Sequence, residues 1–190
     1  GKVRGSFFTH RDPESGELEM VDVPDGVSLQ RDPVTRKLTL VDLTDEEVEA
    51  MLALVEELAD WNTRMNLTAI KDPAEVVDKH LLDSLAVLPH LKGLSIADIG
   101  TGAGFPGLPL AIADLDRRYT LVESTGKKAE FVRHAAAMLR LPNVEVVQGR
   151  AEALKPSQLF DSAISRALGS LADFVRVAGH LTGRGGRLLA

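Results

Sequence analysis

One stretch constrains the fold of this chain more than any other, a glycine-rich segment over residues 97–107 that reads ADIGTGAGFPG. The apolar run before it, residues 94–99, is typical of a short buried strand, and residues 108–113 are typical of the start of a helix. Glycine allows positive φ and lets the backbone approach a ligand closely. A strand, a glycine turn and a helix in this order indicate the opening unit of an α/β domain that binds a nucleotide or a related cofactor.

Alternating strand and helix patterns continue from this unit to the end of the chain. Apolar runs predict four more strands, over residues 119–123, 144–147, 160–164 and 185–190. Periodic runs predict helices over about 106–114, 126–139 and 170–180. Such alternation is typical of a parallel sheet with right-handed crossovers. We therefore expect an α/β fold in which residues 93–190 form one Rossmann-like domain.

The residues before this domain divide into two segments. Residues 1–43 contain a weak repeat with a spacing of 20, in which an Arg-Asp-Pro turn is followed by an alternating run. The repeat predicts two β-hairpins in one small meander, with a structural or docking role. Residues 44–92 are expected to form two helices that pack on the domain. Thr44 and Glu47 match a capping box at the first helix start, and Pro73 lies in the first turn of the second helix.

Composition excludes several kinds of site. The chain has no cysteine, which rules out disulfides, a thiolate nucleophile and a zinc site built on Cys. No apolar run approaches the ~20 residues of a membrane span, and no secretory signal opens the chain. We expect a cytoplasmic protein with no membrane association and no metal site.

Charge is distributed unevenly along the chain. The net charge is −6, yet residues 1–60 carry 15 acidic and 6 basic side chains, whereas residues 117–190 carry 12 basic and 6 acidic ones. The second half could therefore face a polyanion. Ordinary solvated surface is the other interpretation of these charges. The candidate phosphate contacts are Lys127, Lys128, Arg133, Arg140, Arg150 and Arg184.

Two carboxylates and a proline narrow the choice of ligand for the glycine turn. Residues 102–107 match G-x-G-x-x-G, and Glu123 lies 21 residues after Gly102, where a dinucleotide fold has its ribose-binding acid. Pro106 lacks an N–H that a pyrophosphate would use, and Asp98 adds a negative charge before the turn. S-adenosylmethionine has no phosphate and carries a sulfonium and an ammonium, so it suits Asp98, while Glu123 can accept from both ribose hydroxyls. A turn- or helix-capping role for Asp98 stays open, as does a nicotinamide cofactor.

Several short runs carry a family resemblance. They are WN at 61–62, NLTAI at 66–70, HLLDSL at 80–85, DIGTGAGFPG at 98–107, LVES at 121–124 with KK at 127–128, RAE at 150–152 and SRA at 165–167. Over about three quarters of its length the chain thus resembles the RsmG (GidB) family of bacterial ribosomal RNA methyltransferases. The resemblance implies a class I methyltransferase sheet, S-adenosyl-L-methionine as the cofactor, and methyl transfer to N7 of a guanine in 16S rRNA of the small ribosomal subunit.

The expected cofactor-binding residues come from the turn and from the ends of the following strands. Those implied by the resemblance are Gly100, Phe105, Ala151, Glu152 and Arg166. Those expected from the turn and the next strand end are Asp98, Gly102, Gly104 and Glu123. At Gly104, a change to Val is expected to block cofactor binding by filling the space that the backbone needs.

The expected chemistry needs no strong base. Guanine N7 carries a free lone pair, so the enzyme contributes mainly proximity and orientation, worth up to about 7–11 kcal/mol in ideal cases. Arg166 is the candidate catalytic residue, because its planar donor fork can orient the guanine or the methionine carboxylate. A salt bridge to Asp161 or another acid is the alternative role. His80 and Asp83, at i and i+3, are expected to pair and to tie their helix to the turn.

Two departures from the family and two rival functions stay open. Residues 1–43 are not part of the family pattern, and the family's chain continues past the strand at 185–190 with two more strands. We therefore expect a C-terminally incomplete sheet with an exposed edge. The rival functions are an NAD-type oxidoreductase and a non-catalytic RNA- or ribosome-binding module. A monomer that binds the small ribosomal subunit is expected.

Overall fold

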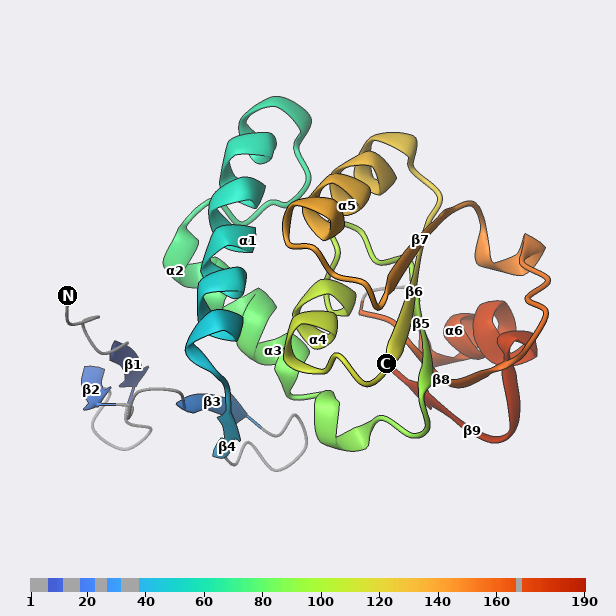
Figure 1. Ribbon diagram of the computed structural model, residues 1–190, viewed down its shortest axis with the longest axis horizontal. Helices are drawn as coiled ribbons and strands as arrows, with labels where there is room; N and C mark the ends of the chain where they lie inside the picture. Colours follow the sequence, from blue (N-terminus) through green and yellow to red (C-terminus); the bar gives the residue numbers. More distant parts are fainter. Residues whose placement is uncertain (1–6, 12–17, 23–26, 32–37, 167–168) are drawn as a thin grey trace.

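The computed structural model describes residues 7–11, 18–22, 27–31, 38–166 and 169–190. Its centre is a five-stranded parallel sheet with the spatial order β7-β6-β5-β8-β9 (Figure 1). The strands are β5 Ser95–Ile99, β6 Arg118–Glu123, β7 Val144–Gln148, β8 Phe160–Ile164 and β9 Thr182–Leu189. The α/β fold and the parallel sheet that the alternating pattern predicts are confirmed.

The strand order puts the point at which the connections diverge at the glycine turn, and the region outside this point is hereafter called the crevice. The chain moves from β5 to β6 and β7 on one side, and then returns to β8 and β9 on the other side of β5. In open parallel sheets, ligands bind outside the carboxyl ends of the strands where the connections diverge in this way. The carboxyl ends of β5 and β8 lie side by side here, with Asp98 opposite Ile164. The fold therefore favours this edge of the sheet as the functional site.

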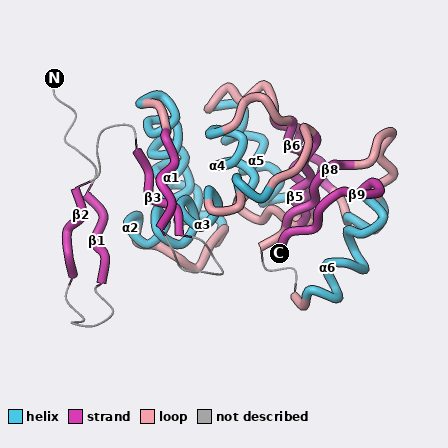
Figure 2. The backbone as a smooth tube through the Cα atoms, turned by 90° about the horizontal axis from the view of Figure 1, so that it is seen from below, coloured by secondary structure: helices cyan, strands magenta, loops and turns pink. Residues whose placement is uncertain are grey.

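Helices cover both faces of the sheet (Figures 1 and 2). On one face lie α4 Gly107–Ala113 and α5 Gly126–Met138, with α1 Asp45–Met65 packed against both, and on the other lies α6 Leu171–Ala178. Successive side chains of a strand point to opposite faces. Ile96 of β5 accordingly joins the larger core with α1, α4 and α5, whereas Ala97 and Ile99 join the smaller core with α6.

The capping box predicted at the start of α1 is present. The Thr44 hydroxyl accepts from the Glu47 N–H at 3.2 Å, and the Glu47 carboxylate accepts from the Thr44 N–H at 2.7 Å. Two of the N–H groups that a helix start leaves unpaired are thereby satisfied. Met51, Leu54 and Leu58 then bury one side of α1 against the α/β layers.

The second predicted helix is present but irregular. It consists of α2 Pro73–Val76, the π-helix η1 Val77–Leu82 and α3 Asp83–Leu85, followed by the 3-10 turn η2 Leu88–His90. The predicted helix is therefore confirmed over residues 73–85, with a π-helical segment that the apolar pattern does not predict. Each π turn holds an extra residue, so the side chains after it are rotated relative to an α-helix. Such turns are rare in proteins, and those that occur often lie at functional sites. The Ser84 hydroxyl donates to the His80 carbonyl within this segment.

Two antiparallel strand pairs precede α1. They are β1 Phe7–Arg11 with β2 Leu18–Asp22, and β3 Val27–Arg31 with β4 Leu38–Asp42. Both hairpins predicted by the repeat are present, but β2 and β3 share no ladder, so the pairs form two separate sheets and not one meander. The Arg-Asp-Pro and Pro-Asp-Gly turns include residues that lie outside those described.

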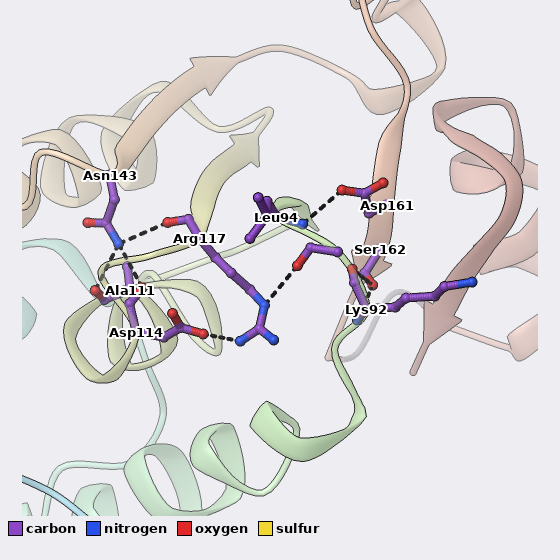
Figure 3. A network of polar contacts seen from close by, with 9 residues as sticks. Lys92, Leu94, Ala111, Asp114, Arg117, Asn143, Asp161 and Ser162 are labelled. Carbon is purple, nitrogen blue, oxygen red and sulfur yellow. Dashed lines mark hydrogen bonds and ion pairs between the residues drawn. The ribbon is translucent and has the colours of Figure 1, made fainter.

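The amino ends of the strands are held by a separate polar network (Figure 3). The Asp161 carboxylate accepts from the N–H groups of Leu94 and Ser95 at 2.8 and 3.0 Å, and the Ser162 hydroxyl bonds both the N–H and the carbonyl of Lys92 at 2.9 Å. These bonds fix the loop before β5 to β8. They also commit Asp161 to the edge of the sheet opposite the glycine turn.

In the described part of the chain, no helix has the length and apolar character to span a bilayer.

Candidate functional site

The glycine turn leaves the carboxyl end of β5 and closes onto the end of β6. The N–H groups of Gly100 and Thr101 donate to the Val122 backbone carbonyl at 2.9 and 3.0 Å. The Gly102 N–H donates to one Glu123 carboxylate oxygen at 2.9 Å, and the Thr125 N–H donates to the other at 2.7 Å. Glu123 is buried. The turn and the Glu123 carboxylate therefore form one hydrogen-bonded unit.

This closure uses the N–H groups that a phosphate would need. The N–H groups of Gly104 and Phe105 both donate to the Thr101 carbonyl at 3.0 Å. The Gly107 N–H donates to the Asp98 carboxylate at 2.9 Å. Pro106 has no N–H at all. Phosphate sites in such turns depend on free N–H groups at the start of the helix. The geometry therefore argues against a pyrophosphate and against the nicotinamide alternative.

Asp98 is buried beneath the turn and holds it in place. Its Oδ2 accepts from the Thr101 hydroxyl at 2.6 Å and from the Gly107 N–H at 2.9 Å. Its Oδ1 is buried with no hydrogen-bond partner among the described residues. The turn- and helix-capping role considered for Asp98 is thus present. Contact between Asp98 and a ligand stays a prediction.

Burial makes the ionisation of Asp98 pH-sensitive in a range that can be measured. Burial raises the pKa of Asp98 from 3.8 to about 6, against the opposing hydrogen bonds from Thr101 and Gly107. The folded protein therefore keeps a proton between about pH 4 and pH 6 that the unfolded chain has lost, so stability falls as the pH rises through this window. The loss is on the order of 3 kcal/mol.

Asp98→Asn is expected to remove this pH dependence, because Asn keeps the side-chain shape and one acceptor but does not titrate. The free energy of unfolding, measured by urea titration between pH 4 and pH 7, should fall with pH in the wild type by about 3 kcal/mol more than in Asp98→Asn. Two parallel pH profiles would contradict a raised pKa at Asp98.

The glycines of the turn serve two different purposes. Gly102 has φ +62°, and the nearest atom to a Cβ built there is the Gly100 oxygen at 4.0 Å, so this position faces open space. Gly104 has φ +89°, and a Cβ there would lie 2.3 Å from the Leu108 side chain. The expectation that Gly104→Val fills ligand space is therefore corrected, since the added atoms would meet the protein's own helix. At Gly102 an added side chain would instead meet open space.

Arg166 extends from the end of β8 to the helical segment that precedes the domain. Its Nη1 donates to the Lys79 carbonyl at 3.0 Å and lies 3.8 Å from Asp83 Oδ2. Its guanidinium carbon is 5.7 Å from the centre of the Phe105 ring. Burial lowers the pKa of Arg166 and the Asp83 charge opposes that shift, but a guanidinium stays protonated. The alternative role, a salt bridge to Asp161 or another acid, is thus present, with Asp83 and not Asp161 as the partner.

His80 stacks on the glycine turn. Its ring lies 4.9 Å from that of Phe105, with 25° between the planes. Nδ1 donates to the Lys79 carbonyl at 3.2 Å, and Nε2 lies 3.1 Å from the Thr68 hydroxyl. Burial and then the Arg166 charge lower the pKa of His80. The ring is therefore neutral near pH 7, and its Nε2 accepts from the Thr68 hydroxyl.

The expected pairing of His80 with Asp83 is corrected by these contacts. His80 bonds to Thr68 and Asp83 pairs with Arg166, so the two side chains tie the helix to the crevice through different partners. Thr68 was not predicted as part of the site, and neither was Asn62, whose Oδ1 accepts from the Thr68 N–H at 2.9 Å. Both belong to runs that carry the family resemblance, which is the signal that could have identified them.

Ala151 and Glu152 follow β7 in the 3-10 turn η3 Ala151–Ala153. Ala151 is buried and Glu152 is exposed. The Gly149 N–H donates to the Glu123 carbonyl at 2.9 Å, which fixes the start of this segment beside the end of β6. The segment therefore leaves the sheet at the edge that carries the glycine turn.

The six predicted phosphate contacts are distributed over both ends of the sheet. Within the described residues, none of the six forms an ion pair. Lys127 and Lys128 lie in the first turn of α5, just after Thr125 bonds Glu123, whereas Arg184 lies near the start of β9. The structure thus brings the two lysines to the carboxyl edge and leaves Arg184 toward the amino edge.

Comparisons with known proteins agree with the fold and identify relatives of this chain. The family model described as rRNA small subunit methyltransferase G (GidB) matches residues 47–190. A Pasteurella multocida protein named ribosomal RNA small subunit methyltransferase G is 42% identical over 161 residues, which are 85% of this chain and 77% of that protein. A protein of the same name from Stenotrophomonas maltophilia K279a is 51% identical over 140 residues, which are 74% of this chain and 66% of that protein.

Among solved structures, one of a candidate O-methyltransferase from Klebsiella pneumoniae superposes with a TM-score of 0.51 at 18% identity. The match covers 68% of this chain and 60% of that one. At this identity the likeness concerns the fold alone, and it supports a Rossmann-like α/β sheet.

Proposed function

This chain belongs to the GidB family of small-subunit rRNA methyltransferases, and on that premise we propose that it methylates N7 of a guanine in 16S rRNA with S-adenosyl-L-methionine as the donor. The observation that carries the choice of cofactor is the pairing of N–H groups in the glycine turn. The turn closes on itself and on β6, so it offers no cradle for a phosphate. A cofactor that carries cationic groups and no phosphate needs no such cradle.

The residues of the crevice fit such a cofactor. Glu123 uses two of about four lone-pair positions on its carboxylate for backbone N–H groups, which leaves acceptors for ribose hydroxyls. Asp98 lies buried beneath the turn, where its carboxylate favours a cofactor that carries positive charge. Gly102 leaves the space over the turn open, and Gly104 shapes the turn from inside. The proposed cofactor contacts are Asp98, Gly100, Gly102, Gly104, Phe105, Glu123, Ala151, Glu152 and Arg166.

The chain's own groups are suited to orientation more than to proton transfer. The bound cofactor would supply an electrophilic methyl group on sulfur, and guanine N7 needs no deprotonation to attack it. Both ring nitrogens of His80 are engaged within the protein, so His80 positions Phe105 and the helix. Arg166 lies beside the Phe105 ring of the glycine turn and is proposed to orient the guanine or the methionine carboxylate. We place the activity in the cytoplasm, on the small ribosomal subunit, with the protein as a monomer.

Methyl transfer from labelled cofactor to small ribosomal subunits, with the modified base mapped, tests this proposal. We expect label on N7 of one guanine of 16S rRNA. Calorimetry with S-adenosylhomocysteine and with NAD separates the alternatives, since an oxidoreductase would bind only NAD. Tight S-adenosylhomocysteine binding without any transfer would refute the enzyme and favour a binding module.

Gly102→Asn is expected to weaken S-adenosylhomocysteine binding by about 10-fold or more, because Asn tolerates positive φ yet projects into the space over the turn. The free energy of unfolding should change by no more than about 1 kcal/mol. Gly185→Asn is the matched control, since Gly185 also has positive φ and open surroundings, in β9. Equal affinities of both variants for the cofactor would show that Gly102 does not face it.

A further inference from the structure

Arg166 and Asp83 form a donor and an acceptor side by side at the crevice between β5 and β8. The Arg166 Nη1 atom and the Asp83 Oδ2 atom are 3.8 Å apart, which is longer than the ~2.7–2.9 Å of a charge-assisted hydrogen bond. The Asp83 side chain is 57% exposed and that of Arg166 is 31% exposed. The two charges are therefore neighbours that stay accessible from the crevice.

Both groups keep unused hydrogen-bonding capacity. Arg166 spends Nη1 on the Lys79 carbonyl, and its other N–H groups have no partner among the described residues. The Asp83 carboxylate makes no hydrogen bond within the same part of the chain, so both of its oxygens remain acceptors. A ligand that offers one acceptor beside two donors would satisfy this pair.

The base edge of guanine has this arrangement. In order along its edge, guanine presents N7, the O6 acceptor, the N1–H donor and the N2 amino donor. Arginine commonly binds N7 and O6 together, but N7 must stay free when it is the atom methylated. Arg166 neighbours both Phe105 of the glycine turn and Asp83. A donor beside a carboxylate thus matches the neighbouring O6 acceptor and N1/N2 donors of guanine.

Resting on the proposed function, we propose that Asp83 determines base specificity, with its carboxylate accepting from N1–H and N2 of the target guanine while Arg166 donates to O6. Adenine also carries an N7, but it places an amino donor opposite Arg166 and the N1 acceptor opposite Asp83, so it is rejected. Bond formation from N7 to the methyl carbon returns the S–C electron pair to sulfur and leaves the positive charge on the purine. The Asp83 carboxylate lies where it favours that charge.

The test compares guanine with inosine, which lacks the N2 amino group. Small subunits are reconstituted with 16S rRNA that carries guanine or inosine at the mapped position, and kcat/KM is measured on each. The wild type is expected to prefer guanine by about 10-fold, the lower part of the range for one recognition contact. Asp83→Asn has one acceptor where Asp has two, so transfer to guanine should fall about 10-fold and the preference should approach 1.

Control variants accompany this test, and two different outcomes would contradict two different claims. Asp78→Asn, an exposed acid on the same helical segment, should keep the preference, and Asp83→Glu should restore much of it. S-adenosylhomocysteine affinity should be unchanged in all three variants, which also shows that they fold. An equal fall on both bases in Asp83→Asn would overturn the inference and leave Asp83 as a support for Arg166. Absence of transfer by the wild type would instead refute the proposed function, and the inference with it.

Discussion

Replacing Arg166 with Lys is expected to lower methyl transfer to small ribosomal subunits by about 100- to 1,000-fold, the usual effect of removing one positioned donor from an active site. Because Lys keeps the positive charge, the loss of activity measures the contribution of the planar set of N–H donors on the guanidinium. Arg166 bonds the Lys79 carbonyl, neighbours Asp83 and lies near the Phe105 ring at once. A single ammonium on a flexible stem cannot hold these positions together.

Single-turnover transfer at saturating cofactor, together with S-adenosylhomocysteine affinity, shows what Arg166 orients. A fall in the transfer rate with unchanged affinity indicates the guanine, whereas a fall in affinity indicates the methionine carboxylate. Arg176→Lys is the matched control, because Arg176 is an exposed arginine on α6 whose partner, Asp173, lies on the same helix. Transfer by Arg166→Lys within threefold of the wild type would remove Arg166 from the active site.

The sheet and its turn could be predicted because their signals are local. Apolar runs of five or six residues and the glycine spacing predict β5 to β8 to within a residue or two at each end. The α1 start is equally local, since the capping box needs only Thr44 and Glu47. These elements are those in which propensity, periodicity and capping agree.

The contacts of the site could not be predicted in the same way because they join distant segments. Arg166 bonds a carbonyl 87 residues before it in the chain, and no sequence spacing distinguishes Asp83 from Asp161 as its partner. The π-helix was also missed, since an extra residue in one turn leaves no mark in the apolar pattern of residues 73–88. His80, within this segment, contacts Thr68, and Asp83, directly after it, pairs with Arg166.

Gly102 and Gly104 show a finer limit of sequence interpretation. The G-x-G-x-x-G pattern marks both positions, and both have positive φ in the structure. Only the neighbouring atoms distinguish a glycine that leaves room for a ligand from one that leaves room for Leu108. The pattern therefore predicts a turn, while the purpose of each glycine depends on how α4 packs beneath it.

Gly104→Val is accordingly expected to destabilise the fold by about 4 kcal/mol, which combines backbone strain of about 1–2 kcal/mol with overpacking of about 1–3 kcal/mol. At φ +89° a β-branched residue is strained, and its Cβ would lie 2.3 Å from Leu108 Cδ1, a side chain with no exposed surface. For a chain of this size the melting temperature should fall by about 10 °C. Differential scanning calorimetry and urea unfolding measure both quantities.

Two further variants separate the strain from the clash. Gly102→Val carries the same kind of strain at φ +62° but meets open space, so it should lose only about 1–2 kcal/mol. Leu108→Ala in the Gly104→Val background opens room beside the new side chain. The double variant should therefore be less destabilised than the sum of the two single changes, by roughly 1–3 kcal/mol for residues in contact. Strict additivity, or equal losses at Gly102 and Gly104, would mean that Leu108 does not limit the turn. Gly104 would then return to the crevice as a position that faces the ligand.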